Sequence, residues 1–168
     1  MSLSVIVENG SGLSNSTTYV SVQEFRDYWT QRGIDYSSTL YADSTIGIWL
    51  NEATDYADQY YCYNGIKRIK TEATQALEVP RDSWYDKDGY SLDVTVPDGL
   101  KNAIYTLSSE RKGVDSNTIS ETGIANKKIG PVSVSYTNGG ETKTKYIKAN
   151  NYMKGLLEKT SGNLCLSK

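Results

Sequence analysis

Two short loops contain the residues that could bind a metal ion or a phosphate group. Asp86, Asp88 and Gly89 in the stretch DKDG would suit the start of a calcium loop. Such a loop also needs several further oxygen ligands and a glutamate in register at its end, and only Asp93 follows nearby. The stretch NGSG at 9–12 lacks the Gly-Lys-Ser/Thr ending of a phosphate-binding loop. The first stretch is therefore predicted to be a plain turn, and the second to belong to an extended segment.

The composition argues against an enzyme. The 168 residues include no histidine, which removes the commonest proton shuttle, the commonest metal ligand and every triad that needs an imidazole. Catalysis by two carboxylates requires a pair that converges in one pocket, and no spacing indicates such a pair. We therefore expect a protein without catalysis, metal or cofactor.

The spacing of the cysteines and the hydropathy of the sequence indicate where in the cell the protein is found. Cys62 and Cys165 lie far apart and have no metal-ligand spacing, so both are expected to be reduced thiols of an intracellular protein. Residues 1–8 lack the charged start and the long apolar run of a signal peptide. No stretch approaches the length of about 18 apolar residues that spans a membrane. We expect no contact with a membrane.

Tyrosine and lysine are the residues that could bind single-stranded nucleic acid. The chain has 14 Tyr and 3 Trp but only one Phe. Tyrosines stack on bases, and lysine clusters follow phosphates. The basic clusters lie at residues 67–70, 111–112, 127–128 and 143–148. The sequence pI of about 5.2 is low for a dedicated binder, and many tyrosines occur at helical core spacing, so packing around an ordinary core is the alternative.

The charge is distributed unevenly along the chain. Residues 1–63 carry a formal charge of −6, residues 64–140 carry 0 and residues 141–168 carry +4, within a net charge of −2. An acidic front and a basic tail could pair head to tail between copies, or the tail could meet an acidic partner. A solvated lysine-rich terminus is the alternative interpretation.

The first predicted helix has the clearest local signals. Ser21 and Glu24 have the spacing of a capping box, in which each side chain binds the backbone N–H of the other residue. Val20 and Phe25 have the spacing of a hydrophobic staple across the same start. Gly33 is expected to end the helix, because glycine readily adopts the left-handed conformation that follows a helix.

Apolar residues at three- and four-residue spacing predict further helices over residues 45–63, 72–77 and from Pro97 to about 113. Pro80 stops the brief second one, because the residue before a proline is disfavoured in the α region. Trp29 and Trp49 fall on the apolar faces of the first two long helices, so we expect them to pack together or nearly so.

The last third of the chain predicts strands. Val132–Tyr136 and Thr142–Lys148 alternate on either side of a glycine-rich turn, which is typical of a β-hairpin. A short helix is expected over residues 149–158. The predicted fold is mainly α (α+β), a small antiparallel bundle of about four helices with a β-hairpin and extended terminal arms. Its predicted regions are an N-terminal arm at 1–20, a helical core at 21–117, a β-hairpin region at 118–148, and a C-terminal helix and docking tail at 149–168.

Five stretches occur in one order along the chain: TYVSVQEFRDYWTQRG, WLNEATDYADQYY followed after one residue by YNG, QALEVPR, VPDGLKNAIYTL and KKIGPVSVSY. Together they resemble the head-completion proteins of tailed bacteriophages, also called head–tail connector or adaptor proteins. The resemblance covers roughly residues 5–166, and Gln-Ala-Leu-x-x-Pro-Arg is its most specific part. Relatives often have Ala-Trp where this chain has Glu78-Val79. Close relatives are often labelled DnaT-like single-stranded DNA-binding proteins.

The resemblance implies a structural virion protein. Such proteins form a ring, typically of twelve copies, below the portal protein at the tail vertex of the capsid. The ring joins the portal to tail or nozzle proteins and forms part of the channel for the genomic double-stranded DNA. It would be made in the host cytoplasm, as a homo-oligomer without a cofactor. The alternative function is that of a single-stranded DNA-binding replication accessory protein.

The resemblance also implies roles for particular residues. Pro80 would fix a corner and Trp84 would anchor the loop after it. Arg81 would contact a neighbouring subunit or cap a local helix end. The residues expected to face the DNA channel or a neighbour are Lys127, Lys128, Lys143 and Lys145. Those expected to dock on the portal or a neighbour are Leu164, Cys165 and Leu166, in a tail that, like the N-terminal arm, would be mobile or loosely docked in a free monomer.

Overall fold

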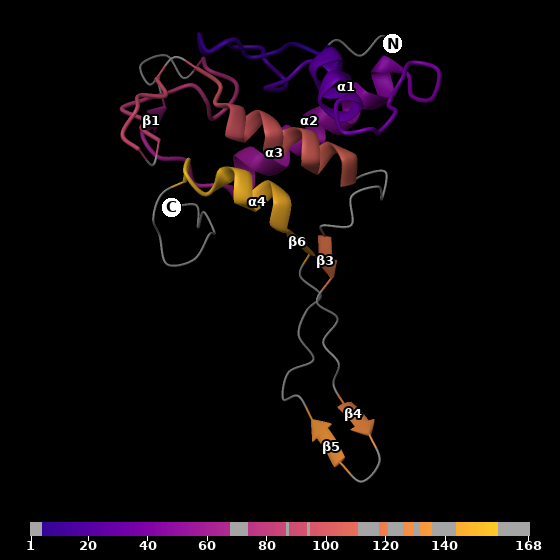
Figure 1. The fold of residues 1–168 in the computed structure, drawn as a ribbon. Helices are drawn as coiled ribbons and strands as arrows, with labels where there is room; N and C mark the ends of the chain where they lie inside the picture. The colour runs from indigo at the N-terminus through magenta and orange to yellow at the C-terminus, as the bar shows by residue number, and fades with distance from the viewer. Residues whose placement is uncertain are drawn as a thin grey trace.

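A computed structural model describes residues 5–67, 74–86, 88–93, 95–110, 118–120, 126–129, 132–135 and 144–157. The helices are α1 (Val22–Thr30), α2 (Asp43–Tyr60), α3 (Asp98–Glu110) and α4 (Ile147–Met153). Helix α3 packs against both α2 and α4 and so forms the centre of the helical body (Figure 1). Within these residues, no helix is both long enough and apolar enough to cross a membrane. The predicted α+β class with four helices is confirmed.

Six short strands form three antiparallel pairs. They are β1 (Ile66–Lys67) with β2 (Arg81–Asp82), β3 (Thr118–Ser120) with β6 (Thr144–Tyr146), and β4 (Asn126–Ile129) with β5 (Val132–Ser135). The β1–β2 pair lies on the helical body, whereas the other two pairs extend away from it (Figure 1).

The predicted hairpin has the wrong partner. Strand β5 pairs with β4, not with the segment that follows the glycine-rich turn, and β6 pairs with β3. Only two residues separate Ile129 from its partner Val132, so β4 and β5 close the shorter loop at the lower entropic cost. The polar stretch NKKI of β4 was not predicted as a strand, because it lacks the alternation of residues that predicted the other strands.

Helix α1 forms as predicted. The Ser21 hydroxyl accepts from the Glu24 N–H at 3.1 Å, and the Ser21 N–H donates to the Glu24 carboxylate at 2.7 Å. At the other end, Gly33 has φ +74°. The Ile34 N–H then reaches back to the Trp29 carbonyl at 3.0 Å, a bond that satisfies a carbonyl with no partner inside the helix.

The other helix boundaries differ from the predicted ones. Helix α2 ends at Tyr60, because Tyr61 turns to an extended conformation and is buried as a core residue. The brief helix predicted over 72–77 is wrong in its described part, since residues 74–77 are not helical. There the Ala76 N–H donates to the Leu13 carbonyl at 2.9 Å, so this segment pairs with the N-terminal segment instead.

The N-terminal segment is packed on the body, in contrast to the predicted loosely docked arm. Glu8 is 2% exposed, and its carboxylate accepts from the N–H groups of Gly10 (2.9 Å), Gly12 (2.9 Å) and Leu13 (2.8 Å). The NGSG stretch is thus an anion-binding loop that holds a carboxylate of its own chain. Glycine at φ +94° and +80° lets the successive N–H groups converge.

Aromatic rings fill the core between α1 and α2. The Tyr36 ring lies 5.9 Å from the ring of Trp29 and 6.4 Å from that of Trp49, so it separates the two tryptophans that were expected to pack together or nearly so. Trp29 is 2% exposed, whereas Trp49 is only partly buried. Many tyrosines of the body are therefore core residues, as the alternative interpretation of their spacing proposed.

Cys62 is disulfide-bonded, so the prediction of reduced thiols is wrong at this position. The large separation of two cysteines along the sequence sets no lower limit on their separation in the fold. Cys165 lies outside the described residues.

The unequal burial of the two tryptophans leads to a prediction. Replacing Trp29 with Ala should lower the free energy of unfolding by about 3–5 kcal/mol, because it leaves a cavity among packed rings. Trp49→Ala should cost about 1–2 kcal/mol, since part of that side chain already contacts water. Urea unfolding followed by far-UV circular dichroism measures both losses, and equal losses would contradict the core described here.

Candidate functional site

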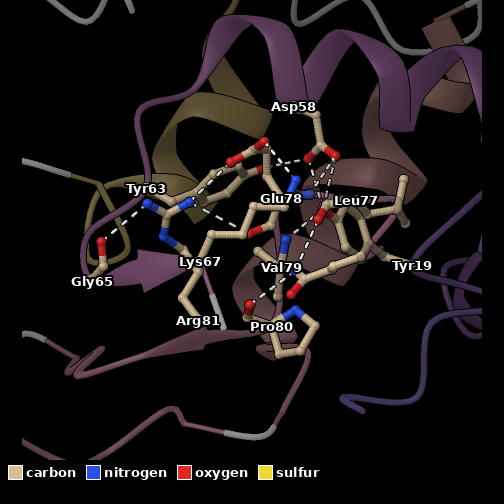
Figure 2. Close-up of polar contacts among 11 residues, drawn as sticks. Tyr19, Asp58, Tyr63, Gly65, Lys67, Leu77, Glu78, Val79, Pro80 and Arg81 are labelled. Atoms are coloured by element: carbon tan, nitrogen blue, oxygen red, sulfur yellow. Dashed lines mark hydrogen bonds and ion pairs between the residues drawn. The ribbon is translucent and has the colours of Figure 1, made fainter. Parts of the chain in front are cut away.

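The Pro80 corner, residues 78–84, crosses the C-terminal end of α2. The Val79–Pro80 peptide bond is cis, and Val79, Pro80 and Trp84 are buried. The backbone then continues into β2, which pairs with β1. Of the three residues that the sequence singled out here, Pro80 and Arg81 lie together at the junction of several segments (Figure 2), and Trp84 follows them in the same corner.

The carboxylate of Asp58, on the last turn of α2, binds the corner. It accepts from the Tyr19 hydroxyl at 2.7 Å, from the Tyr63 hydroxyl at 3.3 Å and from the Glu78 N–H at 3.0 Å. The Val79 N–H in turn donates to the Tyr19 hydroxyl oxygen at 3.0 Å. A single side chain therefore connects α2, the N-terminal segment, the chain beyond α2 and the corner (Figure 2).

Burial sets the protonation of this cluster. It raises the pKa of Asp58 to about 6, and the nearby Glu78 charge adds to the rise, although three hydrogen bonds to the carboxylate oppose it. Burial and then the Asp58 charge raise the pKa of Tyr19 and of Tyr63 well above the ordinary value. Both phenols therefore remain protonated at neutral pH and can donate to the carboxylate.

Arg81 binds the outer side of the corner. One guanidinium nitrogen pairs with the Glu78 carboxylate at 3.0 Å, and the other donates to the Gly65 carbonyl at 3.0 Å. Lys67 also pairs with Glu78, at 3.1 Å. The Arg81 side chain is 14% exposed, and these contacts lie within one subunit, where the planar fork of the guanidinium holds the corner against the chain that leaves α2.

Trp84 joins the corner to the chain after α4. Its indole N–H donates to the Leu156 carbonyl at 3.1 Å, and its ring packs edge-on against that of Tyr63 at 5.9 Å. Beside it, the Asn64 amide donates to the Leu157 carbonyl at 2.9 Å. The corner therefore fixes the position of the chain at Leu156 and Leu157.

The arrangement has the properties of a structural junction. Its carboxylates and phenols bind groups of the same chain, and the described part of the molecule has no cluster of three or more potential metal ligands.

The predicted turn at DKDG is confirmed, since the Asp86 carboxylate accepts from the N–H groups of Asp88 and Tyr90, both at 2.9 Å. Gly89, at φ +87°, completes that turn.

The remaining predicted site residues lie elsewhere. Lys127 and Lys128 are on β4 and Lys145 is on β6, away from the corner (Figure 1). The predicted residues outside the described part of the chain are Lys143, Leu164, Cys165 and Leu166. Their proposed contacts with DNA, the portal or a neighbour stay predictions.

Sequence reasoning missed Tyr19, Asp58 and Glu78. A signal for Asp58 was present, because this carboxylate follows the buried Thr54 by one helical turn and so borders the apolar face of α2. A carboxylate in that place needs hydrogen-bond donors. Nothing in the sequence indicated which donors would supply them.

Among models of known protein families, the one described as "Putative DnaT-like ssDNA binding protein" matches residues 3–167, nearly the whole chain. The chain belongs to this DnaT-like family. No curated protein and no solved structure matches it significantly.

The raised pKa of Asp58 in this DnaT-like chain predicts a pH dependence. The folded state holds a proton on Asp58 up to about pH 6, whereas the unfolded chain releases it near pH 4. The stability from this group is therefore fully present below the unfolded pKa and is lost as the pH rises through about 6. Relative to Asp58→Asn, the wild type should gain about 1–3 kcal/mol between pH 7.5 and pH 4.5.

Urea unfolding of both proteins at several pH values tests this expectation. Other groups titrate alike in the two proteins, so the difference between them isolates Asp58. A stability difference that is independent of pH would mean that Asp58 is not buried in this way.

Two glycines provide a matched test of the corner. Gly65 and Gly33 have φ +77° and +74°, but only at Gly65 would a Cβ lie 2.7 Å from the Asp82 carbonyl. Gly33→Ala should cost about 1–2 kcal/mol, for the left-handed backbone alone. Gly65→Ala should cost about 1–3 kcal/mol more, because β1 and β2 must separate. If urea unfolding shows that both substitutions lower the free energy of unfolding equally, the corner accommodates the added Cβ without strain.

Proposed function

We propose that this protein is a head–tail connector (adaptor) subunit of a tailed bacteriophage, a structural protein without catalysis. The observation that carries the proposal is that the helical body turns most of its aromatic rings inward and binds most of its described cations internally. A surface for single-stranded nucleic acid needs the reverse arrangement, with exposed rings beside uncommitted cations.

The described cations between residues 5 and 110 are occupied, whereas Lys154, after α4, lies exposed. Described residues between 5 and 110 include five Lys or Arg. Arg26 pairs with Asp43 at 2.7 Å, Lys101 pairs with Glu24 at 3.1 Å, and Lys67 and Arg81 share Glu78. The fifth, Arg32, lies over the Tyr28 ring at 3.4 Å and binds the Tyr28 carbonyl. A phosphate backbone would have to break these contacts.

The aromatic rings are largely buried. Tyr19, Tyr36 and Tyr63 are at most 3% exposed. Among the described residues, Tyr85 and Tyr90 are the exposed large aromatic side chains, and they lie in a loop rich in aspartate. Negative charge beside a ring repels the phosphates of a stacked strand.

The charge of the chain favours contacts between copies. Residues 5–110 carry 16 acidic and 8 basic side chains, and residues 111–168 carry 4 acidic and 10 basic ones. One end of the chain is thus acidic and the other basic, which suits the heterologous contacts of a ring. We propose a ring of about twelve copies at the tail vertex of the capsid, with the portal protein on one side and tail or nozzle proteins on the other.

Genomic double-stranded DNA would pass through the channel of this ring. Because the DNA must slide, tight phosphate contacts and base stacking would hinder such a protein. We propose that Lys127, Lys128, Lys143 and Lys145 face the channel or a neighbouring subunit. The subunit would be made in the host cytoplasm before it joins the virion.

A second candidate is a single-stranded DNA-binding replication accessory protein. The printed description of the family favours it, and the basic residues on β4 and β6 are of the type that follows phosphates. This function would place the binding surface on the strands and not on the helical body.

The two candidates differ in two measurements. A connector should bind a short single-stranded oligonucleotide only weakly at physiological salt, with a Kd above about 10 μM by fluorescence anisotropy. When mixed with the portal protein of the same phage, it should form rings that negative-stain electron microscopy can detect. Sub-micromolar binding to the oligonucleotide, without rings, would overturn the connector function in favour of the replication accessory.

A further inference from the structure

The β4–β5 pair has no further strand beside it in the part of the chain that the structure describes. It is a two-stranded sheet, paired only within itself among the described strands, and it lies away from the helices (Figure 1). An isolated two-stranded sheet is marginally stable in water, and a further strand, a helix or another surface normally covers it.

The register of the pair places its residues on two unlike faces. Lys127 is opposite Val134 and Ile129 is opposite Val132, so these four residues fall on one face. The opposite face consists of Asn126, Lys128, Ser133 and Ser135. The pair therefore has a polar face, which suits water, and an apolar face with one lysine, which does not.

The Tyr85–Ser91 loop of the helical body has complementary properties. Tyr85 is 53% exposed and Tyr90 is 73% exposed. The loop itself contains Asp86, Lys87 and Asp88, and Asp82 and Asp93 flank it in the sequence. The bridge between Tyr85 and Ser91 and the turn held by the Asp86 carboxylate give the loop a defined shape. It is thus a formed surface with two exposed rings and a negative charge.

We propose that the apolar face of β4–β5 in one copy docks on the Tyr85–Ser91 loop of the neighbouring copy. Ile129, Val132 and Val134 would cover the exposed tyrosine rings, and Lys127 would approach the aspartates. The two surfaces lie on different parts of the subunit (Figure 1), so the contact is heterologous and can repeat around a ring. This inference rests on the proposed function and names the contact that holds the ring together.

Neighbouring lysines on opposite faces give a matched pair of variants. Lys127→Glu should raise the protein concentration needed for ring assembly about ten-fold, because it sets like charges against each other. Lys128→Glu makes the same charge change on the polar face, which in this arrangement faces the channel and not the neighbouring copy, and should leave assembly nearly unchanged. Combining Lys127→Glu with Asp88→Lys should restore assembly, since the charges are then exchanged. Assembly is measured by sedimentation velocity, with and without the portal protein.

A second pair tests the apolar part of the contact. Tyr90→Ser should weaken assembly, whereas Ile48→Ser, which removes a side chain that is 47% exposed on α2, should not. If the wild type forms rings but all variants assemble equally, or the exchanged charges do not rescue assembly, the docking contact is wrong and the connector function stands. If the wild type forms no ring, alone or with the portal protein, both fail together.

Discussion

A partly buried carboxylate that needs hydrogen-bond donors is the constraint on which the rest of the body depends. Asp58 lies where α2 meets the corner, and an ionised group there is costly unless donors surround it. The chain supplies them from three distant places: the hydroxyl of Tyr19, the hydroxyl of Tyr63 and the N–H of Glu78. Each donor fixes the position of a segment with little secondary structure of its own. The irregular half of the body is therefore organised by polar contacts, while the helices supply the apolar packing.

Glu8 repeats the same solution at the N-terminus. Its carboxylate is enclosed by the backbone N–H groups of Gly10, Gly12 and Leu13, and the Leu13 carbonyl in turn accepts from Ala76 beside the corner. Two internal carboxylates thus replace the ligands that loops of this kind bind in other proteins. The described cations of residues 5–110 contact carboxylates or a ring of the same chain, an arrangement that fits the proposed structural subunit better than a nucleic-acid clamp.

The sequence predicted well what depends on neighbours along the chain. The capping box of α1, the turn at DKDG and the long apolar face of α2 are local signals, and each formed as expected. Strand pairing was predicted wrongly, because β4 has little alternation and its pairing is decided by competition between loops. The corner was recognised through Pro80 and Trp84, but its partners Tyr19 and Asp58 were not, since contacts between residues 39 apart leave no periodic signal.

The contacts of Trp84 and Asn64 also determine how the subunit would bear mechanical load. The last described residues, Leu156 and Leu157, are held through their backbone carbonyls by side chains of the corner and of the chain just before β1. A pull on Leu157 would act on these two hydrogen bonds as well as on the backbone of α4, and through Trp84 it would reach the Pro80 corner and α2. The corner therefore gives traction at Leu157 a second path into the helical body, beside the one along α4.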